Sequence, residues 1–213
     1  MKVYSVAVMA LISVFAGTVQ ADNWYAGIGV GNARFENTGS KLQVSGATAS
    51  YEVNDYSDTA YKLFTGYRFN PNFALEGSYA KLGYIRSSLV VTAPFAGSIT
   101  SDSHGDGWGL DAVGILPLQD SFALFGKLGG FASTMETHLS TTGAVVLAAG
   151  VPADKKHSEF NWKWGAGLMY DISQTLVLRA EWEHYHQIGN TGCADCTGEG
   201  NINAYTLGLA MKF

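Results

Sequence analysis

Large apolar residues alternate with small or polar residues over much of the chain. This period of two is typical of a β-strand with one apolar face, because successive side chains on a strand point to opposite sides. None of the four prolines falls in the middle of such a stretch, where it would break the strand pairing. Eight strands are predicted, at about 24–35, 59–69, 73–86, 106–118, 121–135, 159–171, 175–187 and 202–213.

The connections between these strands alternate in length. Three tight polar turns have a similar pattern, at Asn70–Asn72, Gln119–Ser121 and Ser173–Thr175. Long polar stretches, which we interpret as loops, separate the hairpins, at roughly 36–58, 87–105, 136–158 and 189–201. Short periplasmic turns and long extracellular loops are typical of outer-membrane barrels. We therefore predict an all-β fold, an eight-stranded antiparallel up-and-down transmembrane β-barrel.

Strand alternation also predicts which side chains face lipid. Outward-facing aromatic residues form two belts, as expected at the two surfaces of a membrane. The belt near the short turns contains Tyr67, Phe69, Phe73, Phe122 and Tyr170. The belt near the long loops contains Tyr61, Trp108, Trp162, Trp182 and Tyr205.

The opposite face of the strands carries ionisable residues in nearly equal numbers of each sign. The acids are Glu76, Asp111, Glu181 and Glu183, and the bases are Lys62, Arg68, Lys127, Lys163 and Arg179. An eight-stranded barrel is only wide enough for its own side chains, and an unpaired buried charge is costly. The inward charges therefore predict either a salt-bridged plug or a gated ion path.

Composition agrees with a lipid-facing barrel. Charged residues make up 15% of the chain and aromatic residues 13%, whereas soluble domains have about 25% charged residues. The net charge of −5 argues against a nucleic-acid partner. Residues 1–21 are predicted to be a cleaved signal peptide, because an apolar run follows Lys2 and ends at the cleavage pattern Val19–Ala21. Residues 22–213 then form the barrel domain.

Several short stretches together resemble a known family. They are Asn23–Gly31 (NWYAGIGVG), Gly66–Pro71 (GYRFNP), Lys127–Gly130 (KLGG), Leu178–Trp182 (LRAEW) and the terminal Phe213. In this order the chain resembles the eight-stranded transmembrane domain of the OmpA-like outer-membrane proteins, across essentially the whole mature length. Full-length proteins of this type carry a peptidoglycan-binding domain after the barrel. Since this chain ends on the last predicted strand, cell-wall anchoring is not expected of it.

The resemblance implies roles for two sets of residues. It implies a salt-bridge network inside the barrel, for which the matching positions are Glu76, Lys127, Arg179 and Glu181. It also implies that the last strand is a signal read by the barrel-assembly machinery, through the alternating residues Tyr205, Leu207, Leu209, Met211 and Phe213.

Other candidate sites are weaker. Cys193 and Cys196 form a lone C-x-x-C, which we interpret as a disulfide within a loop, since a redox or zinc site would need features that the sequence lacks. His184 and His186 near Ser158 raise the possibility of a lipid A-modifying enzyme, but the serine is not spaced as in the deacylases. No third residue accompanies the two histidines as a metal ligand, and no cofactor is predicted.

We therefore expect an integral outer-membrane protein of a Gram-negative bacterium, with a structural and surface-interaction role and a plugged lumen. A narrow ion-conducting pore and a lipid A-modifying enzyme are the alternatives. The expected partners are outer-membrane lipids and lipopolysaccharide, the assembly machinery, and a host or phage ligand at the outer loops. Segments 88–99 and 142–152 are unusually apolar for loops. They either extend the hairpins above the membrane or contact such a partner.

Overall fold

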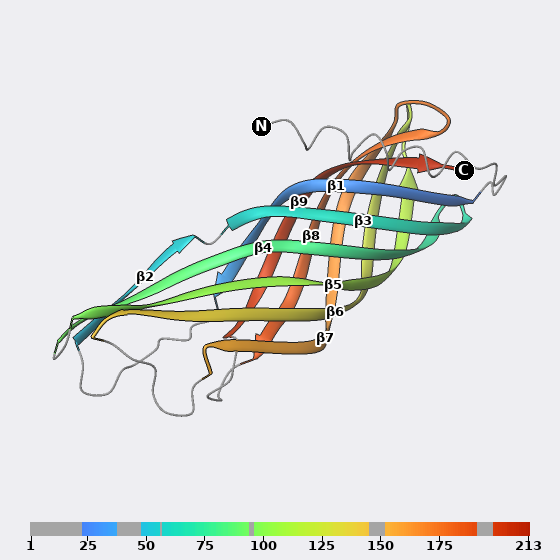
Figure 1. The fold of residues 1–213 in the computed structure, drawn as a ribbon. Helices are drawn as coiled ribbons and strands as arrows, with labels where there is room; N and C mark the ends of the chain where they lie inside the picture. Colours follow the sequence, from blue (N-terminus) through green and yellow to red (C-terminus); the bar gives the residue numbers. More distant parts are fainter. Residues whose placement is uncertain (1–22, 38–47, 56, 94–95, 145–151, 191–197) are drawn as a thin grey trace, which may run out of the picture.

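The strands form a closed antiparallel barrel with an extension at one end (Figure 1). The computed structural model describes residues 23–37, 48–55, 57–93, 96–144, 152–190 and 198–213. Its strands are β1 (Trp24–Asn37), β2 (Thr48–Asp55), β3 (Ser57–Asn70), β4 (Phe73–Ala93), β5 (Gly97–Pro117), β6 (Phe122–Gly143), β7 (Asp154–Asp171), β8 (Leu176–Asn190) and β9 (Gly198–Lys212). The described part of the chain contains no helix that could span a membrane.

Eight strands close the ring, as the sequence predicts. The order around the barrel is β1-β3-β4-β5-β6-β7-β8-β9, and β9 returns to pair with β1. The first and last strands close the ring, with Val30 opposite Leu207. Strand β2 is not a ninth strand of the barrel ring. It pairs with β4 beyond the end of β3, and only residue 56 separates it from β3. It is the outward continuation of β3.

The strands reach further than the alternation predicts. Four predicted loops contain strand residues: β2 lies within 36–58, the β4–β5 hairpin continues through most of 87–105, and β6 and β7 take up parts of 136–158. The ends of β8 and β9 likewise enter 189–201. Most of these segments are rich in serine, threonine and charged residues, so outside the apolar 88–99 they lack the regular apolar face by which a strand is recognised. The apolar segment 88–99 was expected either to extend a hairpin or to contact a partner. In the structure its described residues belong to the extended β4–β5 hairpin.

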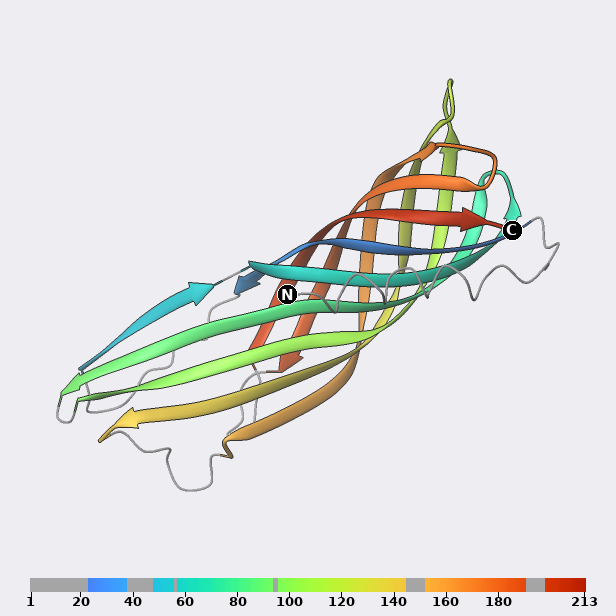
Figure 2. The same ribbon diagram turned by 45° about the horizontal axis from the view of Figure 1, so that its top comes forward.

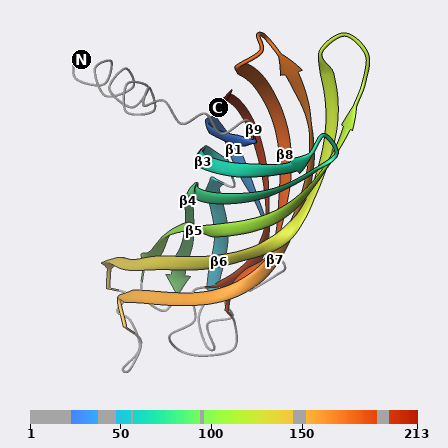
Figure 3. The same ribbon diagram turned by 90° about the vertical axis from the view of Figure 1, so that its right-hand side faces the viewer.

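The extension is a five-stranded sheet that projects from one side of the barrel mouth. It consists of β2 and the outer parts of β4, β5, β6 and β7. Strands β1, β8 and β9 do not reach into it and end nearer the barrel (Figures 1 and 2). We call this end of the barrel the extended end, and the opposite end, with the tight turns, the turn end. Figure 3, a view from the right-hand side of Figure 1, shows the curvature of the wall.

The outer wall is apolar and has an aromatic belt near each end, as predicted. Phe122 and Tyr170 stack at the turn end with ring centroids 4.7 Å apart, and Tyr67 contacts Phe69 at 5.2 Å. Trp108 is exposed toward the extended end. Exposed apolar residues cover the wall between the belts, which is the arrangement of a surface in contact with lipid.

Two apolar clusters fill the lumen, one toward each end. The cluster toward the turn end consists of Tyr25, Phe64, Ala74, Val113, Ile115, Phe125, Met169, Val177 and Ala210. The cluster toward the extended end consists of Ala33, Phe35, Ala60, Ala80, Leu82, Phe131, Met135, Tyr185, Ile188, Ile202 and Ala204. The inward positions between these clusters belong to charged residues. Strand β6 shows the sequence of layers, with Phe125, then Lys127, then Phe131.

The wall has a seam between β7 and β8. Their ladder begins at the turn end and stops at the pair Lys163–Tyr185, although both strands continue toward the extended end. Beyond this point the Asn161 side-chain amide donates a hydrogen bond to the Gln187 carbonyl oxygen, at 2.7 Å. Gln187 has a positive φ of 47°, which marks the bulge where β8 leaves the register of its neighbour.

Candidate functional site: a charged layer inside the barrel

Eight charged side chains meet in the lumen between the two apolar clusters. Six neighbouring strands, β3 to β8, supply them because each has an inward-facing position at the same level of the barrel. They are Lys62, Glu76, Asp111, Lys127, Lys163, Arg179, Glu181 and Glu183. Each is at most 7% exposed. Four carboxylates face four bases, so the formal charge of this group, which we call the charged layer, is zero.

Arg179 and Glu76 form the part of the charged layer nearest the turn end. Arg179 Nη1 donates to Glu76 Oε2 at 2.6 Å, and Nη2 donates to Oε1 at 3.3 Å. The guanidinium lies between two aromatic rings, 4.7 Å from the centroid of Phe64 and 4.2 Å from that of Phe125. The Tyr25 hydroxyl donates to Glu76 Oε2 at 3.0 Å. The contacts with two aromatic rings and the two hydrogen bonds to one carboxylate together hold this arginine in place.

Two lysines occupy the middle of the layer. Lys62 Nζ lies 2.8 Å from Glu183 Oε2 and 3.0 Å from Glu181 Oε1. Lys127 Nζ lies 2.7 Å from Glu183 Oε1 and 3.4 Å from Glu76 Oε1, and it also pairs with Glu181. Each lysine thus contacts several carboxylates, and no two members of this group form an isolated pair.

Lys163 forms the side of the layer nearest the extended end. Its Nζ lies 2.8 Å from Asp111 Oδ2 and 2.9 Å from Glu183 Oε1. The ammonium also lies 5.4 Å from the centroid of the Tyr185 ring. The Tyr185 hydroxyl in turn donates to Glu183 Oε2 at 3.2 Å. A tyrosine from each apolar cluster therefore donates a hydrogen bond to a carboxylate of the charged layer.

The structure brings the four residues implied by the family resemblance into one network. Glu76, Lys127, Arg179 and Glu181 are linked, the last two through Arg179 Nε and Glu181 Oε2 at 3.3 Å. The four other members are Lys62, Asp111, Lys163 and Glu183. Sequence reasoning placed these on the inward face but outside the network. The sequence signal that could have found these four residues was their shared position on the inward face. Strand alternation does not show how far along the barrel axis each residue lies, so it could not show that they meet.

Arg68 faces inward as predicted but lies outside the charged layer. Its guanidinium is 5.7 Å from the centroid of the Tyr25 ring and donates to the Met169 sulfur at 3.7 Å. The level of Arg68 is that of the turn-end cluster. It is therefore separated from the acids of the charged layer by apolar side chains.

In the structure Ser158, His157 and His184, which were considered for catalysis, have other polar partners. The Ser158 hydroxyl pairs with Thr134 on the outer face of the wall, at 3.0 Å. His157 is on the opposite face of the same strand, with Nε2 3.6 Å from Glu159 Oε2. His184 Nδ1 hydrogen-bonds Asn203 Oδ1 at 2.9 Å. Cys193 and Cys196 lie outside the described residues.

Comparison with known proteins decides the family. The model of the OmpA-like transmembrane domain matches residues 19–213. The chain belongs to the OmpA-like transmembrane domain family. Its membership and its relatives place this OmpA-like barrel in the outer membrane of a Gram-negative bacterium.

Two relatives and two solved structures illustrate the match. The chain is 25% identical to outer membrane protein A of Salmonella typhi over 218 residues and 24% identical to that of Klebsiella aerogenes over 221. All of the chain and 56% of each relative are covered, so the chain spans about half the length of these relatives.

Among solved structures, Neisserial surface protein A has a TM-score of 0.53 at 12% identity, covering 89% of this chain and 97% of that protein. OprG of Pseudomonas aeruginosa has a TM-score of 0.52 at 16% identity, covering 91% of this chain and 97% of OprG. At these identities the likeness shows the fold alone.

Proposed function

We propose that this protein is a non-enzymatic outer-membrane barrel with a closed lumen, which stabilises the membrane and presents a surface at the extended end. The observation that supports this most is the layering of the lumen. Eight buried charges pair with one another, and an apolar cluster covers them on each side. An ion entering from either end would have to displace apolar side chains before it reached a charge, and desolvation there is costly.

Conductance in a planar bilayer tests the closed lumen. The protein is refolded in detergent, and its folded state is checked by its altered mobility on a gel without heating. We expect no steady conductance from the wild type at moderate voltage. Steady ohmic steps that scale with the amount of folded protein would establish the alternative, a narrow ion-conducting pore. Turnover of lipid A in the same preparation would establish the other alternative, a lipid A-modifying enzyme.

We also propose how the chain reaches the membrane. Residues 1–21 are a cleaved signal peptide, and the last strand, with Tyr205 and Phe213, is the signal for the assembly machinery. Tyr205 is exposed on the outer wall, where another protein has access to it. Replacing Phe213 with Ala should reduce the amount of folded barrel in cells more than it reduces refolding of the purified chain. Equal losses in both settings would contradict the assembly role.

The extended end faces outward in this proposal, toward lipopolysaccharide and toward any host or phage ligand. The proposed disulfide between Cys193 and Cys196 lies in the last connection at this end. Mass spectrometry of the exported protein should find the two thiols oxidised. Replacing both with Ser should leave the barrel folded, because the bond closes a very short loop.

A further inference from the structure

One inward base is left over when the charges of the lumen are paired. The sequence predicts five bases and four acids on the inward face, and the charged layer pairs four of each. Arg68 is the fifth base, and within the described part of the chain it forms no ion pair. A guanidinium stays protonated in proteins, so the charge of Arg68 persists at any pH at which the barrel is folded.

The contacts of Arg68 do not balance this charge. Its Nη2 donates to the Met169 sulfur at 3.7 Å, and a thioether is a weak acceptor. Its guanidinium lies 5.7 Å from the centroid of the Tyr25 ring. Its Nε is buried and has no hydrogen-bond partner among the described residues. Since a buried donor without a partner is costly, and a charged one more so, this side chain favours an additional acceptor.

Arg68 lines a small pocket in the lumen. Arg179 and Lys212 line it as well, together with apolar and aromatic side chains, and no carboxylate does so in the described part of the chain. Glu76 neutralises Arg179, with closest atoms 2.6 Å apart. Asp171 neutralises Lys212, at 2.7 Å. The uncompensated charge beside the pocket is therefore that of Arg68.

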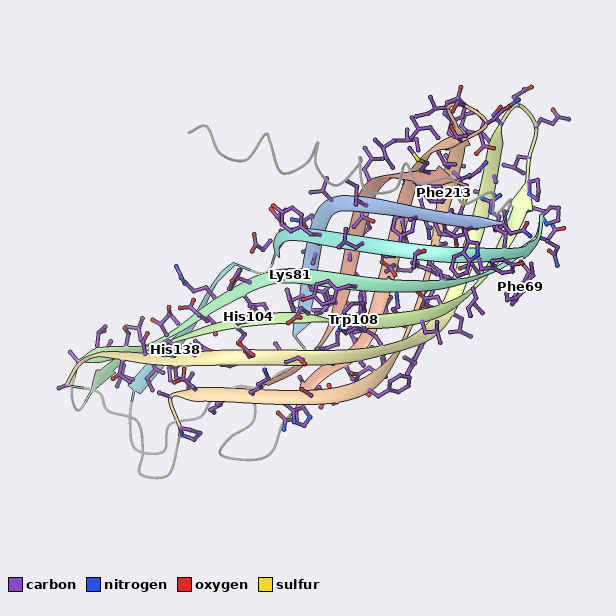
Figure 4. The ribbon with its side chains drawn as sticks, turned by 45° about the vertical axis from the view of Figure 1, so that its right-hand side comes forward. Phe69, Lys81, His104, Trp108, His138 and Phe213 are labelled. Atoms are coloured by element: carbon purple, nitrogen blue, oxygen red, sulfur yellow. The ribbon has the colours of Figure 1, made fainter. Side chains whose placement is uncertain are left out.

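The pocket lies toward the turn end and is narrow. Figure 4 labels Phe69 and Phe213 toward this end, far from His138. Arg68 and Lys212 directly precede these two phenylalanines in the sequence. The free space between the lining side chains is about that of one water molecule. It suits a single-atom ion and is too small for phosphate, sulfate or an organic acid.

We infer that this pocket binds one small monovalent inorganic anion, of which chloride is the common example. The Arg68 guanidinium supplies charge-assisted hydrogen bonds, and the nearby Arg179 and Lys212 add positive potential. The apolar walls strengthen the attraction, because charges interact more strongly where little water screens them. A water molecule of similar size would accept the same hydrogen bonds but would leave the charge of Arg68 uncompensated.

The test measures stability as a function of chloride. The refolded mature protein is unfolded with urea in uncharged lipid vesicles, at constant ionic strength, with chloride replacing gluconate, which is too large for the pocket. An anion that binds only the folded state stabilises it in proportion to its occupancy. Once chloride exceeds the dissociation constant, the unfolding equilibrium constant of the wild type should fall about tenfold for each tenfold rise in chloride.

Two variants isolate the site. Arg68→Gln should lose this chloride dependence, and in gluconate it should be at least as stable as the wild type, because it removes an uncompensated charge. Arg34→Gln, at an exposed position on β1, should keep the wild-type slope. General salt effects act on all three proteins alike, so the difference between their slopes reports the site. Gel mobility without heating shows that each variant is folded.

NMR of the chloride nucleus provides a direct readout of binding. The chloride line should broaden in the presence of the folded wild type, narrow again when bromide is added, and broaden less with Arg68→Gln. Equal wild-type stability in chloride and gluconate, with no line broadening, would show that water alone solvates Arg68. A chloride slope kept by Arg68→Gln would place the anion elsewhere. Neither measurement uses conductance, so a conducting wild type would refute the closed lumen and leave the chloride result standing.

Discussion

Arg179 and Glu76 join opposite walls of the barrel. Arg179 is on β8 and Glu76 is on β4, four strands away in either direction around the ring, and their closest atoms are 2.6 Å apart. Hydrogen bonds of the sheet connect only neighbouring strands. This ion pair connects strands that never touch through their backbones, and it does so where both side chains are at most 2% exposed.

Removing either partner should destabilise the barrel strongly. Arg179→Ala leaves a buried carboxylate without its closest base, and Glu76→Ala leaves a buried guanidinium, at a cost of about 3–5 kcal/mol each. The double variant should lose less than the sum of the singles, because the two sites are coupled. Urea unfolding of the protein in lipid vesicles, followed by tryptophan fluorescence, measures all three values.

The exposed pair Arg86–Asp102 is the control for these variants. It has the same chemistry and the same closest distance of 2.6 Å, but the arginine side chain is 62% exposed. Arg86→Ala should therefore cost about 1 kcal/mol or less. If Arg179→Ala and Arg86→Ala had equal, small effects, the charged layer would be hydrated and the lumen open to water.

A second prediction concerns close packing where the ring closes. A Cβ at Gly31 on β1 would meet the Tyr205 carbonyl oxygen on β9, whereas a Cβ at Gly77 would have no neighbour nearer than 4.0 Å. Gly31→Ala should cost roughly 1–3 kcal/mol, because the backbone of β9 must shift. Gly77→Ala should change stability by less than about 0.5 kcal/mol. Equal effects in urea unfolding would contradict the tight closure of β1 on β9.

A third prediction concerns the seam between β7 and β8. Where the ladder is missing, from 154 to 162, every second β7 amide lacks a backbone partner on the β8 side. These amides should exchange with deuterium faster than those of 163–171, which have neighbours on both sides. Hydrogen exchange read by NMR in detergent or nanodiscs gives this profile. Uniform protection along β7 would show that the two strands pair over their full length.

The fourth prediction concerns orientation. A cysteine in place of Ala96, at the tip of the β4–β5 hairpin, should react with a membrane-impermeant thiol reagent on whole cells. A cysteine in place of Gln174, in the tight turn before β8, should react only after the outer membrane is opened. Both positions are exposed, so access to the reagent differs only through the membrane. The reverse pattern would place the extension in the periplasm.

The sequence predicted the barrel because lipid imposes a strong pattern on its wall. The alternation through Tyr61, Leu63 and Phe69 identified both strand and face, and the structure confirms it. The same reasoning missed β2 and offered the extension only as one of two explanations for the apolar segment 88–99, because a strand with water on its face has no regular apolar period to detect. Strand alternation placed the charged residues Lys62 and Glu183 on the face that points into the lumen. Which charges meet depends on strand stagger, which follows from pairings between distant segments.

The charged layer has a consequence for the order in which the barrel forms. Its eight members come from β3 to β8, and the closing strands β1 and β9 contribute none. At the level of the layer, β1 and β9 present Gly29 and Gly208 directly opposite each other. Six consecutive strands can therefore complete the ionic core as an open, curved sheet. Joining β1 to β9 last would then add no further charged residue to this layer, and the contacts made directly between β1 and β9 would be backbone hydrogen bonds and close packing.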